Sequence, residues 1–244
     1  MADRIDQAES WVLHTRPYRE TSLLVDVFSR EQGRLSLVAR GGRRPLSSLR
    51  ARLLAFQPLT LSWFGKGAVR TLHAAEWQGG LRDLAGGTLI CGFYLNELLL
   101  RLLPAEDAHA TLFDAYGATL HALADGEAAE RCLRRFELIL LEEMGYAEPL
   151  HQTAAGEPVE ADRRYRWHPE TGLVEVSKEA EGGANAGPYS GTYSGAMLQA
   201  LVAGDWSHPA VLQGSKSLMR ALIGHHLGAS QLHTRQLLID LNTL

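Results

Sequence analysis

Apolar and polar residues alternate with the period of β-strands over the first eighty residues. Residues 11–14 open the pattern, residues 21–28 form a largely apolar run, and residues 34–40 alternate strictly. Two further alternating runs follow at 58–64 and 69–76, while residues 16–18 and 30–33 carry turn signals. Five short strands within about 70 residues predict a small closed barrel, of which the OB-fold is the commonest five-stranded form.

The period changes to that of α-helices from about residue 81. Apolar side chains recur at helical spacing over residues 88–103, 108–124 and 127–144, with Pro104 ending the first run and Gly145 placed to cap the third. A small hairpin is expected from residues 165–168 and 172–176, and residues 181–188 have the composition of a flexible linker. Helices are expected again at 194–203, 209–227 and 234–241.

These patterns predict an α+β protein of two domains. Residues 1–80 are expected to form a five-stranded OB-fold β-barrel. Residues 81–244 are expected to form a mainly α-helical domain with a small β-hairpin insertion, the hairpin and linker occupying about residues 148–193.

Net charge changes sign between the two regions. Residues 1–80 hold 12 Lys and Arg against 7 Asp and Glu, a net charge of +5, whereas residues 81–244 hold 12 against 21, a net charge of −9. Such asymmetry within a chain of net charge −4 suggests a nucleic-acid-binding module joined to a region of another role.

Composition narrows the class of protein further. Hydrophobic residues make up 45% and charged residues 21%, as in globular proteins, and no apolar run approaches the roughly 18 residues of a membrane span. The polar N-terminus does not resemble a signal peptide, so a cytoplasmic location is expected. Cys91 and Cys132 lack the spacing of a metal site and are expected to be buried, reduced thiols.

The residues most suggestive of chemistry lie between the third and fourth predicted strands. Residues 40–52 contain two glycines, two serines and five arginines, namely Arg40, Arg43, Arg44, Arg50 and Arg52. Arginine forks bind phosphate oxygens, and glycine lets backbone N–H groups approach them. A DNA-binding patch is therefore predicted at this loop, extended from neighbouring strands and turns by Arg16, Arg19, Arg34, Lys66 and Arg70. The alternative is a solvated loop without a partner.

Four aromatic residues of the barrel admit two interpretations. Trp11, Tyr18, Trp63 and Phe64 could stack on bases, or could fill the interior. The interior is favoured, because a small barrel needs large side chains inside.

Enzyme motifs are missing from the sequence. Lys66 does not belong to a P-loop, and no GxSxG or HExxH run occurs. His225, His226 and His233 form the one local histidine cluster, but adjacent helical residues point about 100° apart and make poor paired ligands. No catalytic residue is expected, although a hydrolase using His225, His226 and an Asp stays open as a third hypothesis.

Several colinear segments of the chain match those of one known family. The first is HTRPYRETSLL at residues 14–24, followed by Gly33-Arg34 and by LVARG at 37–41 with Arg43 after it. The match extends through YLNELL at 94–99, LRRFEL at 133–138, Gly145-Tyr146, GEPV at 156–159 and TRQL at 234–237. Over essentially the whole chain and in the right order, these segments resemble the RecO family of DNA repair and recombination proteins.

The resemblance implies a non-catalytic mediator of recombinational repair with no cofactor. Such a protein would bind single- and double-stranded DNA, anneal complementary strands, and with RecR help RecA replace single-stranded-DNA-binding protein, in the cytoplasm at the nucleoid. A generic OB-fold protein that binds RNA or associates with ribosomes is the alternative, because it would share the basic barrel.

Two details of the resemblance bear on particular residues. Some family members carry a four-cysteine zinc site after the Gly-Tyr pair, but residues 148–176 contain no cysteine, so no zinc is expected. The family also binds the acidic C-terminal tail of single-stranded-DNA-binding protein on its helical domain. Candidate residues for that tail are Arg134, Lys216 and Arg220, unless Arg134 merely pairs with Glu130 or Glu137 on its own helix.

Overall fold

The structure is a computed structural model that describes residues 4–176, 191–228 and 232–234. The chain divides into two units, the first made of residues 1–129 with 232–244 and the second of residues 130–231. The predicted linker at 181–188 lies outside the described residues, as does the predicted helix at 234–241 apart from its first residue.

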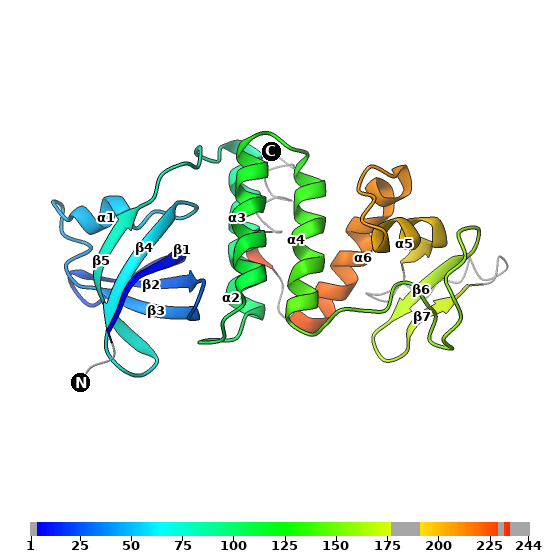
Figure 1. Ribbon diagram of the computed structural model, residues 1–244, viewed down its shortest axis with the longest axis horizontal. Coiled ribbons are helices and arrows are strands. Elements are labelled where there is room, and N and C mark those ends of the chain that lie inside the picture. The colour runs from blue at the N-terminus through cyan, green and yellow to red at the C-terminus, as the bar shows by residue number, and fades with distance from the viewer. Residues whose placement is uncertain (1–3, 177–190, 229–231, 235–244) are drawn as a thin grey trace. The chain divides into compact units, whose positions relative to one another are not determined.

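Five strands close the barrel of the first unit (Figure 1). They are β1 (Arg4–Tyr18), β2 (Ser22–Ser29), β3 (Gly33–Ala39), β4 (Pro58–Phe64) and β5 (Val69–Trp77). Around the barrel the order is β1-β2-β3-β5-β4, with β4 returning to β1, and every pair is antiparallel except β3 with β5. This confirms the predicted α+β class with an N-terminal five-stranded barrel of the OB type.

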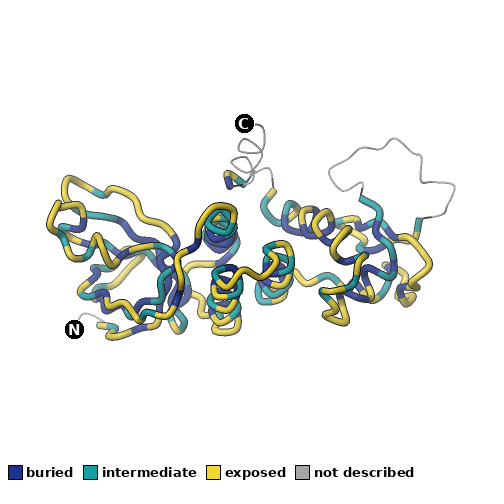
Figure 2. Tube along the Cα trace, turned by 90° about the horizontal axis from the view of Figure 1, so that it is seen from above, coloured by how far each residue is buried: buried dark blue, intermediate teal, exposed yellow. Residues whose placement is uncertain are grey.

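The barrel forms because alternate side chains of each strand fill its interior. Burial alternates residue by residue along β3, as the sequence predicts. Val25, Leu37, Leu61 and Trp63 are fully buried in the core, and Figure 2 shows buried residues in the strands and exposed ones gathered in the connecting loops.

The expected turn at residues 16–18 is wrong. β1 continues through these residues and pairs with β2, with Pro17 opposite Leu23 and Tyr18 opposite Ser22. Proline is tolerated here because β4 pairs with β1 only as far as Trp11, so the missing N–H of Pro17 lies on a strand edge without a neighbour. The turn comes next, and Arg19 takes a positive φ of 52° in it.

Two helices of the first unit pack on one side of the barrel. They are α2 (Gly86–Leu102) and α3 (Ala110–Ala124), close to their predicted bounds. The ring centroids of Trp11 and Tyr116 are 5.5 Å apart, and a side chain at Gly117 would lie 3.2 Å from the Trp11 ring. The glycine therefore permits the close approach of α3 to β1.

A buried hydrogen-bond network joins the same helices to β1. The Asn96 amide donates to the carbonyl oxygen of Leu13 at 2.8 Å, and the Tyr116 hydroxyl donates to Asn96 Oδ1 at 2.5 Å. Burial raises the pKa of Tyr116, so its hydroxyl stays protonated and available as a donor.

The described residues of the second unit form a small sheet and three helices. Its elements are α4 (Ala129–Glu143), β6 (Arg164–His168), β7 (Gly172–Glu175), β8 (Thr192–Ser194), α5 (Gly195–Val202) and α6 (Pro209–Leu227). The predicted hairpin is confirmed as β6 and β7, and β8 adds a third strand in the order β7-β6-β8. Fully buried Trp167 lies in β6.

Gly145 ends α4 as predicted. Its φ is 71°, and the Tyr146 N–H donates to the Leu141 carbonyl at 2.7 Å, which is the pattern of a glycine-capped helix end. Among the described residues, no helix is both long and apolar enough to cross a membrane.

Candidate nucleic-acid interface

The basic loop, residues 40–52, leaves the end of β3 in successive tight turns. The N–H groups of Gly42, Arg44 and Ser47 donate to the carbonyls three residues before them at 3.0–3.2 Å, and Gly41 takes a φ of 69°. The loop then enters the short helix α1 (Ser48–Arg52), which sequence patterning did not predict. Because the backbone bonds to itself, most side chains of the loop point outward.

Arg43 ties the basic loop to the turn between β1 and β2. Its Nη1 donates to the carbonyls of Arg19 and Glu20, each at 3.1 Å, and its own N–H donates to Thr21 at 2.9 Å. Arg43 therefore positions the loop, and its remaining guanidinium N–H groups stay available to a phosphate.

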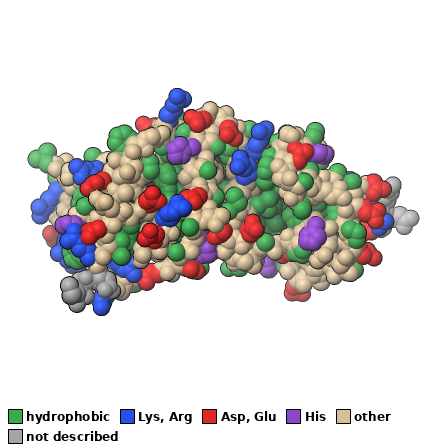
Figure 3. Space-filling view, viewed as in Figure 1, with side chains coloured by type: hydrophobic (Ala, Val, Ile, Leu, Met, Phe, Trp, Pro, Cys, Tyr) green, Lys and Arg blue, Asp and Glu red, His purple; other side chains and the backbone are tan. Residues whose placement is uncertain are grey.

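The other cations of the basic loop face solvent. Arg40, Arg44 and Arg50 are exposed, and in the part of the chain that the structure describes their side chains make no hydrogen bond or ion pair with another residue. Arg52 is also exposed and donates to the Ala75 carbonyl at 3.1 Å, which fixes α1 against β5. Figure 3 shows several Lys and Arg side chains over the barrel on the face drawn.

Two predicted cations of the β1–β2 hairpin lie exposed near its turn. The Arg19 guanidinium carbon lies 5.3 Å from the Tyr18 ring centroid, and Arg16 Nη1 lies 3.9 Å from an oxygen of buried Asp26. Arg19 shares the turn that Arg43 binds, so the structure brings it to the basic loop.

Arg34 and Arg70 are placed differently from the other predicted cations. Arg34 Nε donates to the Leu103 carbonyl at 2.8 Å, and Arg70 Nη2 lies 3.0 Å from Glu106 Oε1. Both bind the connection between α2 and α3. Arg34 and Arg40 lie at opposite ends of β3, about 20 Å apart along the strand. Lys66 is exposed in the turn between β4 and β5.

The four aromatic residues divide between the two interpretations. Trp11 and Trp63 are buried, as the interior interpretation predicts, whereas Phe64 is partly exposed and Tyr18 lies between buried and exposed.

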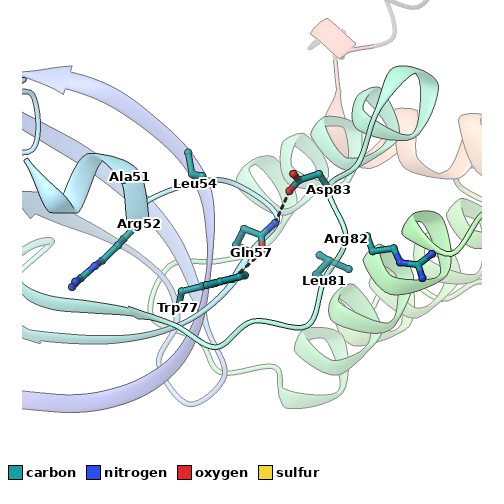
Figure 4. Close-up of a pocket in the computed structure, with 8 residues that line it drawn as sticks. All are labelled: Ala51, Arg52, Leu54, Gln57, Trp77, Leu81, Arg82 and Asp83. Carbon is teal, nitrogen blue, oxygen red and sulfur yellow. Dashed lines mark hydrogen bonds between the residues drawn. The ribbon is translucent and has the colours of Figure 1, made fainter.

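An exposed tryptophan that sequence reasoning missed lies beside the basic loop. Trp77 ends β5 and lines a groove of about 650 Å³ (Figure 4). Its side of the strand is that of buried Ala75, so alternation alone would place it in the core. It is nevertheless 62% exposed, because it lies past the end of the barrel interior, opposite Leu59. The Gly-Gly pair that follows marks this end of the strand.

The three candidate residues for an acidic tail lie in the second unit. Arg134 is 12% exposed and its Nη2 lies 2.6 Å from Oε1 of fully buried Glu137. Lys216 Nζ on α6 lies 3.8 Å from Glu130 Oε1 on α4, which places the two helices side by side, and Arg220 is exposed one turn further along α6. The intrahelical pairing of Arg134 is therefore present.

Two histidines of the predicted cluster, His225 and His226, take part in ring packing. His226 stacks on Tyr146 with ring centroids 3.9 Å apart, and His225 meets Trp167 edge-on at 5.8 Å. Burial, with the nearby His225, lowers the pKa of His226. In the ranges that the structure describes, no three His, Cys, Asp or Glu side chains are grouped to hold a metal ion. Cys132 is buried as expected, Cys91 only partly so, and neither forms a disulfide bond.

Comparisons with known proteins identify relatives over the full length of the chain. A family model described as Recombination protein O N terminal matches residues 1–80, and one described as Recombination protein O C terminal matches residues 85–236. The chain is 48% identical to the DNA repair protein RecO of Azoarcus sp. strain BH72, over 98% of this chain and 97% of that protein. It is 47% identical to the DNA repair protein RecO of Ralstonia nicotianae, over 99% of this chain and 86% of that protein.

Proposed function

The chain belongs to the RecO family of DNA repair proteins, and from this membership we propose that it mediates recombinational repair by binding and annealing DNA. It binds single- and double-stranded DNA, pairs complementary strands, and with RecR helps load RecA onto DNA coated by single-stranded-DNA-binding protein. The observation that carries the proposal is the group of exposed, unpaired arginines Arg40, Arg44 and Arg50 on the basic loop.

Annealing follows from electrostatics without a reacting group. Two complementary strands repel one another through their phosphates, and a surface that neutralises some of those charges lowers the repulsion and releases counterions. Base pairing then supplies the sequence match. We therefore propose a protein that is not an enzyme and needs no cofactor, and that works at the nucleoid.

The DNA site and the division of labour belong to the same proposal. Residues 1–80 form the DNA-binding domain and residues 81–244 the helical domain for partners. The contacting cations are Arg16, Arg19, Arg40, Arg43, Arg44, Arg50, Arg52 and Lys66. Arg34 and Arg70 face the connection between α2 and α3, so any role they have at DNA is through the placement of the barrel.

Partner binding is proposed for the second unit. Lys216 and Arg220 lie one turn apart on an exposed face of α6 and suit an acidic peptide tail such as that of single-stranded-DNA-binding protein. Arg134 takes part only if the tail replaces its bond to Glu137. The generic RNA-binding alternative is not favoured, because full-length relatives carry the name of DNA repair protein.

The experiment is annealing of two complementary labelled oligonucleotides over a salt series, bare and coated with single-stranded-DNA-binding protein. Fast annealing that fades with salt and survives the coat is expected. Folded protein that anneals neither bare nor coated strands at any salt would refute the proposal. Lys216→Ala/Arg220→Ala is expected to slow annealing of coated strands alone. Arg44→Ala/Arg50→Ala removes the same two charges from the barrel and is expected to slow annealing of bare and coated strands alike.

A further inference from the structure

We propose that the Trp77 groove binds one unpaired base of single-stranded DNA, a contact that duplex DNA cannot make. The inference rests on the proposed DNA binding and adds to it a subsite and a basis for strand preference. The Trp77 groove is lined by Arg52, Leu54, Gln57, Trp77, Leu81 and Asp83, with Ala51 and Arg82 beside them (Figure 4).

The Trp77 ring is held in place at its polar edge. Its Nε1 donates to Gln57 Oε1 at 3.0 Å, and Gln57 Nε2 donates to Asp83 Oδ1 at 3.1 Å (Figure 4). The residue is 62% exposed, so these bonds fix the orientation of the ring while leaving much of the side chain open. A fixed aromatic ring stacks on a base with little further loss of conformational freedom.

Apolar side chains make up much of the wall of the groove. Leu54 is 55% exposed beside Trp77, and Leu81 lines the same space from the chain segment that precedes α2. The volume of about 650 Å³ falls in the range of small-ligand sites and is ample for a nucleotide. An exposed Trp and an exposed Leu that share one groove mark a binding surface more than a folding requirement.

The charges around the groove favour the phosphate backbone at one side of Trp77 and the base at the other. Arg52 is the last arginine of the basic loop, so a backbone bound along that loop reaches the Trp77 groove at Arg52. Asp83 lies at the other side of Trp77 and repels a phosphate there, while the side chain of Arg82 extends away from Trp77 (Figure 4). A neutral base, whose ring or amino N–H groups can donate to Asp83 or Gln57, suits that position better than an acidic peptide does.

Strand preference follows from the geometry of stacking. An unpaired base presents its face to Trp77, whereas a base within a duplex is already stacked and paired. The basic loop binds phosphates of either form, whereas the Trp77 groove supplies a contact that separates them.

The first test compares Trp77→Ala with Trp77→Phe, using oligothymidylate and a duplex of equal length as probes. The Ala variant is expected to lose about 5- to 100-fold in affinity for oligothymidylate and less than about 2-fold for the duplex, while the Phe variant retains most of the affinity. Equal losses of affinity for both probes, or no loss for either, would contradict the assignment of the Trp77 groove as a site for an unpaired base. Wild-type protein that binds neither probe would instead overturn the proposed function along with it.

A photocrosslink gives a second readout that needs no variant. Oligothymidylate in which single thymines are replaced by 5-iodouracil is expected to crosslink to the peptide that contains Trp77, as mapped by mass spectrometry. Crosslinks confined to other peptides would contradict the assignment. A second contradicting result would be a groove that binds a peptide instead of a base. In that case an acidic peptide with a terminal aromatic residue would bind wild type but not Trp77→Ala, while Trp77→Ala would bind oligothymidylate normally.

Discussion

Arginine side chains have different surroundings near the two ends of β3. Where β3 begins, Arg30 binds Asp114 and Arg34 binds the Leu103 carbonyl. Arg70 of the neighbouring β5 likewise binds Glu106, so all three partners lie in α3 or in the connection that leads to it. Where β3 ends, Arg40, Arg44 and Arg50 are exposed and have no partner among the described residues. Arginine therefore secures the helices at one end and is left free for an anion at the other.

This difference shows why a count of arginines does not locate a binding site. A guanidinium that already satisfies a carboxylate or a carbonyl must break that bond before it binds a phosphate. An exposed, unpaired guanidinium loses only water and counterions. The helix-facing end should therefore govern folding stability, and the basic loop should govern affinity for DNA.

The largest expected effect on stability is at the helix-facing side of the barrel. Asn96→Ala removes two buried hydrogen bonds, the one to the Leu13 carbonyl and the one from the Tyr116 hydroxyl, and is expected to lower the free energy of unfolding by about 3 kcal/mol. Urea unfolding measures this change. Tyr116→Phe removes only the bond to Asn96 and is the milder control, with an expected loss of about 1 kcal/mol. If Asn96→Ala lost no more than this control, the network would not be what joins the helices to β1.

Arg34→Ala comes next in size. Loss of its bond to the Leu103 carbonyl, which belongs to a buried residue, is expected to lower the free energy of unfolding by about 2 kcal/mol. DNA affinity of the folded variant should stay within about 2-fold of wild type, because this guanidinium does not face the basic loop. A fall in affinity as large as that of a basic-loop variant would remove the distinction between the two ends.

Glu97 in α2 is expected to make the stability of the first unit depend on pH in the acid range. Burial acts to raise its pKa, but bonds from Thr234 and His233 and the charge of Arg101 outweigh burial and lower the pKa below the usual 4.5. The ionised form therefore contributes stability above pH 4.5, which is lost as the pH falls through the lowered pKa.

Glu97→Gln removes this charge while keeping the size of the side chain, and should be less stable than wild type by about 1 kcal/mol at pH 7. The difference should shrink as both proteins are unfolded at successively lower pH below 4.5. A difference that stays constant down to pH 2–3 would show that the charge of Glu97 is not what matters.

The smallest stability effect is expected at the basic loop. Arg44→Ala/Arg50→Ala should change the free energy of unfolding by less than about 0.5 kcal/mol, because neither side chain has a partner to lose. Thermal unfolding checks this, and a loss above about 1 kcal/mol would indicate a structural role for the loop arginines.

Sequence periodicity predicted those parts of the fold in which one face of an element is buried. The strict alternation of β3 and the helical spacing of α2 and α3 each mark a buried side, and both appear at nearly the expected residues. The three-residue strand β8 and the five-residue helix α1 are too short to show a period. Pro17 was misjudged because its effect depends on whether a second strand lies beside β1, which local sequence does not reveal.

The candidate site could be located from sequence only as a region of charge. Which arginines are free depends on pairings across long stretches of chain, such as Arg70 with Glu106. Trp77 follows the alternation of a core residue and is exposed only because the barrel interior ends before it. Both facts are tertiary, so no local pattern encodes them.

The most direct test of the account is the salt dependence of DNA affinity in matched variants. Wild type, Arg44→Ala/Arg50→Ala and Arg34→Ala would be titrated with one oligonucleotide from low to moderate salt. The basic-loop variant is predicted to lower the magnitude of the log–log slope by about 2, one for each lost phosphate contact, and Arg34→Ala to leave it unchanged. An unchanged slope in the basic-loop variant, or an equal fall in Arg34→Ala, would contradict the account.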